Sequence, residues 1–297
     1  MSEYNELVCY KQIEIGTYGK LKFFLEKHST KEGTWGKLLL REGEIDFVFL
    51  NGQGHELSRT RIDQYHSHLL IHPAAWHKII SVSESFNATL EFYCVPQRYF
   101  NKKYGLSSVH SDLVYIYQTY LNHLQRSSIL DVGCGSGRNL LYLANMGHLV
   151  RGIDYNQAAL SAIQEIAQKE RLSRVYTQLC DLNQPINLES ERYDMVLSTV
   201  TLQFLNPERI PDLLRALQGM TKKGGYHFLV VPIRSELYSL PDFFTYVPQK
   251  EELYRFYQDS GWSVLEYKES VGHLHKQDEL GLQISGLFCL LLAQKTM

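Results

Sequence analysis

The chain has 297 residues, a formal net charge of −2, 44% hydrophobic residues and 21% charged residues. This length accommodates two modest domains or one large one, and the composition is that of an ordinary globular protein. A general partner of nucleic acids or membrane surfaces needs a clustered excess of Lys and Arg, so the near-neutral charge argues against both classes of partner.

The first part of the chain, residues 1–97, consists of short apolar segments separated by turn-forming residues such as Gly43, Gly52 and Pro73. Short strands at this spacing are typical of a small all-β barrel or sandwich. We therefore predict a β-rich accessory domain over 1–97, with strands at 38–40, 45–50, 69–72, 78–82 and 89–94.

The second part, residues 98–297, alternates apolar strand patterns with segments of helical periodicity. This alternation predicts an α/β domain in which a mostly parallel, seven-stranded sheet carries helices on both faces. The predicted strands are 128–132, 149–154, 175–181, 193–200, 226–231, 263–268 and 284–292, and the predicted helices are 139–146, 158–171, 207–220 and 251–260.

A glycine-rich loop follows the first of these strands directly. Asp131 precedes three alternating glycines, Gly133, Gly135 and Gly137, which permit positive φ and close approach of a ligand to the backbone. A dinucleotide fingerprint spaces its glycines G-x-G-x-x-G, and Arg138 occupies the position of its last glycine. The loop therefore predicts S-adenosyl-L-methionine (SAM) binding in a Rossmann-like methyltransferase fold, with Arg138 either at the cofactor or on the surface of the first helical turn.

Further cofactor ligands are expected where the next strands end, because ligands lie outside the carboxyl ends of parallel strands. Asp154 is placed to accept from the ribose hydroxyls, and Asp181 with the backbone of Leu182 from the adenine amino group. Ser198 and Thr199 are expected beneath the sulfonium. Taken alone, Asp154 or Asp181 could simply cap the helix that follows it. Together with Asp131, they place acidic residues at three successive strand ends, and this pattern favours a binding site.

Seven short motifs follow one another along the whole chain. They are H-S-T-K-x-G-T-W-G at 28–36, P-x-x-W-H at 73–77, Y-F-x-x-K-Y at 99–104, G-C-G-x-G-R-N-x-x-Y-L at 133–143, L-S-T-V-x-x-x-F-L at 197–205, G-G-Y at 224–226 and G-H-L-H-K-x-D at 272–278. In this combination they resemble the tellurite-resistance methyltransferase family TehB, in its long form with an N-terminal cupin-like domain.

The resemblance implies SAM-dependent methylation of tellurite, selenite and related chalcogen compounds, and hence resistance to them. It places His275 and Lys276 at the acceptor as catalytic residues, in a loop between the last two strands, with Tyr104 and His110 closing the cofactor site from the other side. A solvated turn is the alternative for the His-Lys pair. Relatives usually carry an arginine where this chain has Gln283, and Arg234, near the end of the fifth strand, is a candidate substitute.

The N-terminal part is rich in histidine: His28, His66, His68, His72 and His77. His66 and His68 would project to one face of a strand, a spacing that can bind a metal. The full set of metal-binding residues of a cupin cannot be identified in the sequence, so no metal ligand is predicted. The domain is expected to be an accessory that binds an oxyanion or a metal, against the alternative that each histidine is a packing or surface residue.

Two other functions stay open from the sequence: methylation of a small thiol or other metabolite, and SAM or oxyanion binding without turnover. The five cysteines are scattered and contain no C-x-x-C pair, which argues against a disulfide framework or a thiolate zinc site. Since the N-terminus lacks the pattern of a signal peptide, we expect a cytoplasmic enzyme. Its expected partner is a small chalcogen oxyanion, with no nucleic acid, no membrane and a possible homodimer.

Overall fold

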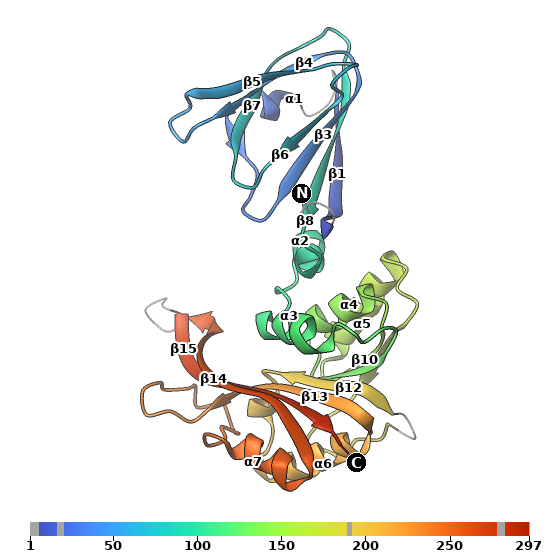
Figure 1. Ribbon diagram of the computed structural model, residues 1–297, viewed down its shortest axis with the longest axis vertical. Helices are drawn as coiled ribbons and strands as arrows, with labels where there is room; N and C mark the ends of the chain where they lie inside the picture. The colour runs from blue at the N-terminus through green and yellow to red at the C-terminus, as the bar shows by residue number, and fades with distance from the viewer. Residues whose placement is uncertain (1–5, 17–20, 189–191, 278–282, 297) are drawn as a thin grey trace. The chain divides into compact units, whose positions relative to one another are not determined.

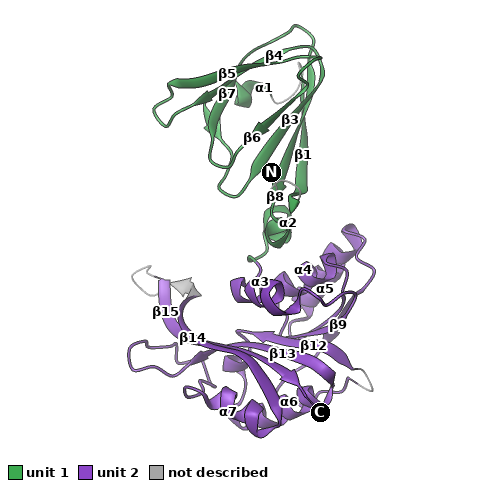
Figure 2. Ribbon diagram, viewed as in Figure 1, with its two compact units in different colours: residues 1–108 green, residues 109–297 purple. Residues whose placement is uncertain are grey.

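The computed structural model describes residues 6–16, 21–188, 192–277 and 283–296, with the backbone alone for 274–277. It divides into two compact units, Met1–Ser108 and Val109–Met297 (Figure 2). We call these the N-terminal and C-terminal units. The boundary between them falls later in the chain than the predicted boundary after residue 97, so the segment that follows the last strand of the β domain is counted with the N-terminal unit.

The N-terminal unit consists of two four-stranded antiparallel sheets (Figure 1). One has the order β1-β8-β3-β6 and the other β2-β7-β4-β5. The predicted all-β domain is therefore confirmed. Its strands are β1 (Val8–Gly16), β2 (His28–Ser29), β3 (Trp35–Glu42), β4 (Ile45–Leu50), β5 (Glu56–Ile62), β6 (His68–Ile71), β7 (Trp76–Val82) and β8 (Asn87–Cys94), with helices α1 (Leu21–Phe24) and α2 (Tyr99–Tyr104) and a short 3₁₀ turn, η2 (Pro96–Arg98).

Alternating side chains supply the core of this unit. In β3, for example, Leu38 and Leu40 are buried while their neighbours along the strand are more exposed. β5 was not predicted, because all but its last residues are exposed and it pairs only with β4 at the edge of its sheet. An edge strand of this kind shows no apolar alternation in its sequence.

The C-terminal unit contains a seven-stranded sheet of order β11-β10-β9-β12-β13-β15-β14. The first five strands in this order run parallel, and β15 pairs antiparallel with both β13 and β14. The predicted mostly parallel, seven-stranded sheet is thus confirmed. Its strands are β9 (Ser128–Val132), β10 (Leu149–Asp154), β11 (Val175–Leu179), β12 (Tyr193–Thr199), β13 (Thr221–Ile233), β14 (Trp262–Gln277) and β15 (Gln283–Lys295).

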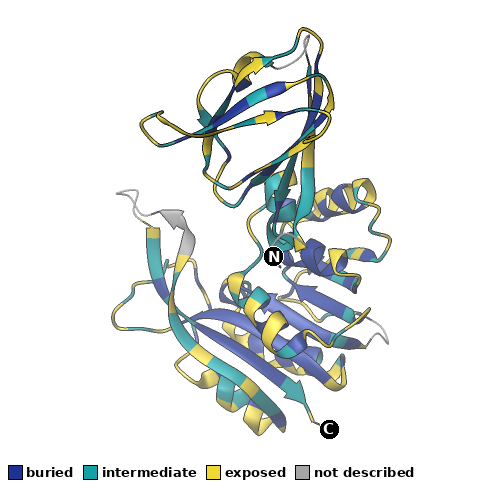
Figure 3. Ribbon diagram, turned by 45° about the horizontal axis from the view of Figure 1, so that its top comes forward, coloured by how far each residue is buried: buried dark blue, intermediate teal, exposed yellow. Residues whose placement is uncertain are grey.

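Helices cover both faces of this sheet, with α3, α4 and α5 on one face and α6 and α7 on the other (Figure 1). The central strands β12 and β13 are buried along most of their length (Figure 3). No helix among the described residues is both long and apolar enough to cross a bilayer. The helical segments are α3 (Ser111–Ile116), the π-helical η3 (Tyr117–Leu121), α4 (Arg138–Asn145), α5 (Gln157–Lys169), η4 (Leu202–Phe204), η5 (Pro207–Arg209), α6 (Ile210–Gly219) and α7 (Glu252–Asp259).

Two predicted boundaries in this unit are wrong. The strand predicted to begin at residue 226 begins at Thr221, shortly after α6 ends at Gly219, so Gly224 and Gly225 lie inside β13. β14 also extends to Gln277, so His275 and Lys276 belong to a strand and not to a loop. The long β14–β15 hairpin forms through backbone pairing, which a polar, histidine-rich sequence does not reveal.

Candidate cofactor site

The glycine loop between β9 and α4 is held against the end of β10 by backbone hydrogen bonds. The N–H groups of Gly133 and Cys134 both donate to the carbonyl oxygen of Ile153, at 2.8 and 3.1 Å. Gly137 donates to the carbonyl of Cys134 at 2.9 Å and then begins α4 as its N-cap. The loop is therefore a defined turn that ends in a helix N-terminus, which is the arrangement that favours a negatively charged ligand group.

Each of the three glycines has a positive φ, but for different local reasons. A Cβ at Gly133 would lie 2.1 Å from Cγ2 of Thr201, and one at Gly137 would lie 2.7 Å from Cγ1 of Ile163. At these two positions a neighbouring side chain leaves no room for a Cβ atom. At Gly135, with φ of 52°, a Cβ would meet no atom within 4 Å. Gly135 therefore borders open space, where a ligand can approach the main chain.

Asp154, at the carboxyl end of β10, ties the loop to the start of α5. Its Oδ2 accepts from the N–H of Gly135 at 2.8 Å, and its Oδ1 accepts from the N–H of Asn156 at 2.9 Å. The side chain is buried. Each carboxylate oxygen retains a further lone pair for a ligand hydroxyl.

Asp131 is the penultimate residue of β9 and is 3% exposed. Its Oδ2 is buried without a hydrogen-bond partner among the described residues. Burial raises the pKa of this carboxyl to about 7, Arg138 opposes the rise, and Asp154 adds to it. A buried, unpaired carboxylate oxygen is costly unless a ligand donates to it.

Beside the loop lies a cavity of about 650 Å³. Of the predicted cofactor residues, it is lined by Gly133, Gly135, Asp154, Asp181 and Leu182. Asp181 is exposed, and its Oδ1 accepts from the N–H of Asn183 at 2.9 Å. The cavity thus brings together residues from the ends of three strands, which the prediction required.

Sequence reasoning missed further residues of the cavity wall. Each lies within a few positions of a predicted strand end or of a loop glycine. Their place in the chain, and not their residue type, could therefore have indicated that they line the cavity. These residues are Ser136, Tyr155, Asn156, Ala159, Asn183, Thr201, Phe204 and Leu205.

Ser198 and Thr199 end β12 as predicted, but their hydroxyls bond to the protein. Ser198 Oγ donates to the carbonyl of Val132 at 3.1 Å, and Thr199 Oγ1 accepts from the side-chain amide of Asn139 at 2.9 Å. The side-chain oxygen of Asn139, Oδ1, accepts a hydrogen bond from the N–H of His110 at 3.0 Å. Buried Asn139 therefore fixes the start of α3 to the end of β12, which makes Thr199 and His110 neighbours of the cavity rather than residues of its wall.

Val200 follows β12 with a φ of 56°, in the left-handed region that a β-branched residue rarely adopts. Its N–H donates to the carbonyl of Val230 at 2.8 Å, which holds the residue to the sheet. Strain of this kind costs about 1–2 kcal/mol and collects at ligand sites. Here it lies in the wall of the cavity, at the carboxyl edge of the sheet.

The remaining predicted site residues are not among the described lining residues of the cavity, and Asp131, inside β9, is one of them. Tyr104 belongs to the N-terminal unit, where its ring stacks on Phe100. The side chains of His275 and Lys276, and Asp278 of the same motif, lie outside the described residues. Arg234 follows β13 and lines a different cavity of about 490 Å³. Arg138 and Gly137 lie behind the loop in α4 and its cap, outside the cavity wall.

The histidine pair predicted in the N-terminal unit is not formed. His66 precedes β6 in an exposed bend, so it does not share a strand face with His68. Within the described ranges no group of three His, Cys, Asp or Glu side chains is arranged to hold a metal ion. His28 and His77 come together instead, directly opposite each other in β2 and β7.

The cavity has the properties of a site for a cationic ligand with an amino-acid end. Two carboxylates and no Lys, Arg or His are among its described lining residues. Asp131 has a buried carboxylate oxygen without a partner among the described residues, and Gly135 borders open space, so a ligand could contact both. A sulfonium cofactor with an ammonium, a carboxylate and two ribose hydroxyls matches this donor and acceptor set.

Comparison with known proteins agrees with this arrangement. Residues 92–292 match the family model "Tellurite resistance protein TehB", and residues 16–90 match the "TehB-like domain". A relative from Haemophilus influenzae, named "Probable S-adenosyl-L-methionine-dependent methyltransferase TehB", is 39% identical over 98% of this chain and 99% of its own length.

Solved structures give the same result. The crystal structure of TehB from Haemophilus influenzae has a TM-score of 0.91 and 36% identity, covering 98% of this chain and 99% of that chain. A putative methyltransferase from Bacillus halodurans, at 17% identity and a TM-score of 0.51, covers 63% of this chain and all of its own, and shows the fold alone. The chain therefore belongs to the TehB family of SAM-dependent methyltransferases.

Proposed function

We propose that this methyltransferase transfers the methyl group of SAM to a tellurite- or selenite-type chalcogen compound and thereby confers resistance to it. The observation that carries the proposal is the match to the TehB family over almost the whole chain, in combination with a cofactor cavity of the appropriate charge. The family description names tellurite resistance, and it is the source of the acceptor class.

Each polar group of the cavity wall has a proposed partner on the cofactor, and so does Asp131, which is not among the described lining residues. Asp131 accepts from the ammonium of the cofactor, and the loop around Gly135 approaches its amino-acid end. Asp154 accepts from the ribose hydroxyls with the lone pairs left over from its two backbone hydrogen bonds. Asp181 and the backbone of Leu182 bind the amino group of the adenine. The ring of Tyr155, which is 79% exposed, lies at the mouth of the cavity.

When bound, the cofactor supplies an electrophilic methyl group on a sulfonium. The contribution of the protein is alignment, because an in-line displacement gains most of its acceleration from holding the two reacting atoms in place. The rigid turn that Asp154 fixes, and the Asn139 bridge between Thr199 and His110, position the two sides of the site. A chalcogen centre with a lone pair requires no strong general base.

His275 and Lys276, in the last part of β14, are proposed to hold the oxyanion through positive charge and N–H donors. Gln283, which begins β15, is the register partner of Gln277, so the position where relatives usually carry an arginine lies on the strand opposite this segment. Replacing a cation there by an amide weakens the preference for a dianion, which keeps a small thiol as the second candidate acceptor.

Acceptor profiling tests the proposal. Purified protein is given SAM with selenite, tellurite or small thiols, and formation of S-adenosylhomocysteine is measured as an initial rate. We expect turnover above background with a chalcogen compound and a lower kcat/KM with thiols. Faster turnover of thiols would support the second candidate, and SAM binding without turnover of any acceptor would support a binding protein instead.

A further inference from the structure

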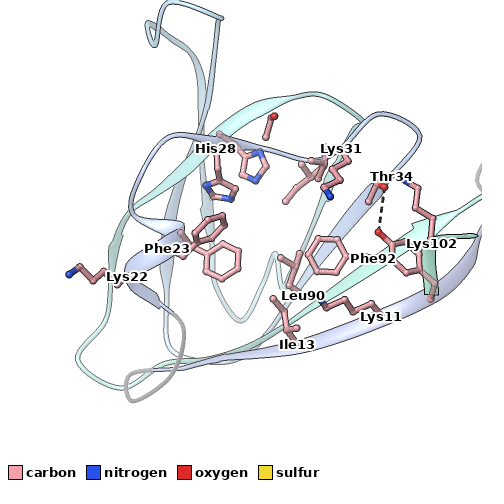
Figure 4. A pocket seen from close by; sticks show the side chains of 16 residues that line it. Lys11, Ile13, Lys22, Phe23, His28, Lys31, Thr34, Leu90, Phe92 and Lys102 are labelled. Carbon is pink, nitrogen blue, oxygen red and sulfur yellow. Dashed lines mark hydrogen bonds between the residues drawn. The ribbon is translucent and has the colours of Figure 1, made fainter. Parts of the chain in front are cut away.

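The N-terminal unit contains a cavity of its own, with a volume of about 760 Å³ (Figure 4). Its wall is assembled from β1, α1, β2, β6, β7, β8, α2 and the connection between β2 and β3, so every lining residue belongs to the same unit. A cavity of this size matches a small organic molecule and is much larger than an inorganic oxyanion or a metal ion requires.

The charged side chains of this wall are all of one sign. Lys11, Lys31 and Lys102 line it, Lys22 lies at its edge with the ammonium turned away (Figure 4), and no Asp or Glu is among its described lining residues. Lys31 forms no ion pair or hydrogen bond through its ammonium within the described part of the chain, and Lys102 donates only to the backbone carbonyl of Glu32 at 3.2 Å. Burial lowers the pKa of Lys102, and the positive charges of Arg98 and Lys31 lower it further. An anion in the cavity would relieve this repulsion.

Hydroxyl groups lie beside these lysines. Thr34 is almost fully buried, and its Oγ1 is 3.4 Å from the hydroxyl of Tyr10. A turn closed by the hydrogen bond from Thr34 N to Lys31 O, 3.0 Å long, carries Lys31 toward the cavity. Figure 4 shows Lys31, Thr34 and Lys102 on the side of the pocket opposite to Phe23. Together these groups form a polar, cationic end.

The other end is aromatic. Phe23, Phe24 and the rings of His28 and His77 pack together, with the two imidazole centroids 4.2 Å apart. Both Nδ1 atoms face backbone carbonyls, of Glu26 and Ala75, and must donate to them. The Nε2 atom of His28 is buried without a hydrogen-bond partner among the described residues. Burial lowers the pKa of His77 to about 4, so this imidazole is neutral at physiological pH.

We propose that the N-terminal unit is a binding domain for a small organic acid with an apolar body. The anionic head lies among Lys11, Lys31 and Lys102, and the apolar body lies against Phe23, Phe24 and Phe92. A polar hydrogen on the far end of the ligand would satisfy His28. This site is distinct from the cofactor cavity, and it gives the β domain a ligand-binding function that does not depend on the methyl acceptor.

The full-length protein tests this proposal with anilinonaphthalene sulfonate, a fluorescent aromatic sulfonate, as the probe. Saturating S-adenosylhomocysteine is present throughout, so that the cofactor cavity is blocked. Competitors are naphthoate, its neutral analogue naphthalenemethanol, and inorganic phosphate. We expect saturable probe binding that naphthoate displaces, with naphthalenemethanol weaker by about tenfold or more because a charge-assisted hydrogen bond is lost. Phosphate alone, without the apolar body, is expected not to compete at similar concentrations.

Variants locate the site. In Lys31→Met/Lys102→Met the affinity for naphthoate should fall about tenfold or more while the affinity for the neutral alcohol is retained. Lys22→Met is the matched control, since the ammonium of Lys22 points away from the pocket in Figure 4 and its loss should leave naphthoate affinity within about twofold. Thermal unfolding and SAM affinity verify that the variants are folded.

Equal displacement by the acid and the alcohol would overturn the proposal, as would unchanged naphthoate affinity in the double variant. Displacement by phosphate alone would mean that a small oxyanion, and not an organic acid, is the ligand.

Discussion

The two cavities of this protein differ in the sign of their charge and in how the chain builds them. The cavity beside the glycine loop contains two carboxylates and no cationic side chain among its described lining residues, whereas the cavity of the β domain contains four lysines and no carboxylate among its own. The first suits a cationic cofactor and the second an organic anion. The comparison shows that the same chain contains two separate recognition sites of opposite preference.

The cavities also differ in backbone control. Around the cofactor, three glycines with positive φ and a strained valine set the path of the main chain, so binding depends on backbone geometry. In the β domain the ligand-facing groups are side chains, most of which project from strands and helices, with Lys31 and Thr34 in the connection between β2 and β3. Changes to the backbone should therefore affect the first site far more than the second.

The largest effect is expected from Gly133→Val. The new side chain would collide with Thr201 in a position that already needs a positive φ, so SAM affinity should fall by about a hundredfold or more. Binding of the fluorescent sulfonate to the β domain should be unchanged.

Gly147→Ala is the control: its φ of 91° is also positive, but its Cβ meets nothing within 4 Å. It should cost about 1 kcal/mol of stability without weakening SAM. Loss of both ligands in Gly133→Val would mean unfolding and would break the comparison.

The next effect separates turnover from cofactor binding. His275→Ala should lower kcat by about a hundredfold, since a donor to the acceptor is removed, while the Kd for SAM stays within twofold. His273→Ala, two residues earlier on β14, is the control, because the ring of His273 already hydrogen-bonds Ser285 Oγ at 3.0 Å. Equal losses of kcat in the two variants, or a weaker SAM affinity in His275→Ala, would contradict the assigned role.

A smaller loss is expected for Asp154→Asn, measured as the Kd for SAM by calorimetry. The amide keeps one acceptor oxygen, but it loses the charge and one of the two backbone hydrogen bonds that fix the loop. A charge-assisted hydrogen bond contributes about 1.5–3 kcal/mol, so the Kd should rise by about tenfold to a hundredfold. Asp181→Asn, at an exposed carboxylate, should raise it by less. The reverse order would show that the adenine contact, and not the loop, controls affinity.

The smallest effect is the pH dependence that Asp131 imposes. Its folded-state pKa of about 7 lies above the ordinary value of 3.8 for this carboxyl, so the cofactor-free folded protein holds a proton that the unfolded chain has lost. Between about pH 4 and 7 its contribution to stability therefore falls as the pH rises. Binding of the cofactor ammonium requires the carboxylate, so SAM affinity should rise across the same interval and level off above about pH 7. Asp131→Asn should flatten both profiles. A wild-type SAM affinity that is independent of pH would contradict the contact.

The cofactor site was largely predictable because its determinants are short in sequence. Asp131 and the three glycines occupy alternate positions within seven residues, and Asp154 and Asp181 stand at the ends of predicted strands. Chain order in an alternating α/β domain brings such strand ends to one edge. Thr201 and the left-handed conformation of Val200 were missed because they depend on packing and backbone conformation, which residue type does not encode.

The cavity of the β domain was not predictable in the same way. Lys11, Lys31 and Lys102 are separated by long stretches of chain and come together only through the pairing of β1 with β8 and the position of α2. The histidine pair that the spacing suggested, His66 and His68, is split by the start of β6, while His28 and His77 meet across two strands. Such long-range pairing follows from register, which local patterns do not determine.

The most direct test of the central claim uses SAM with a deuterated methyl group. Purified protein, labelled SAM, selenite or tellurite and a thiol reductant are incubated together, and the headspace is analysed by mass spectrometry. The account predicts a volatile methylated selenide or telluride that carries the label, with one S-adenosylhomocysteine formed for each methyl transferred, and its loss in His275→Ala. Tight SAM binding with no labelled chalcogen product would contradict it.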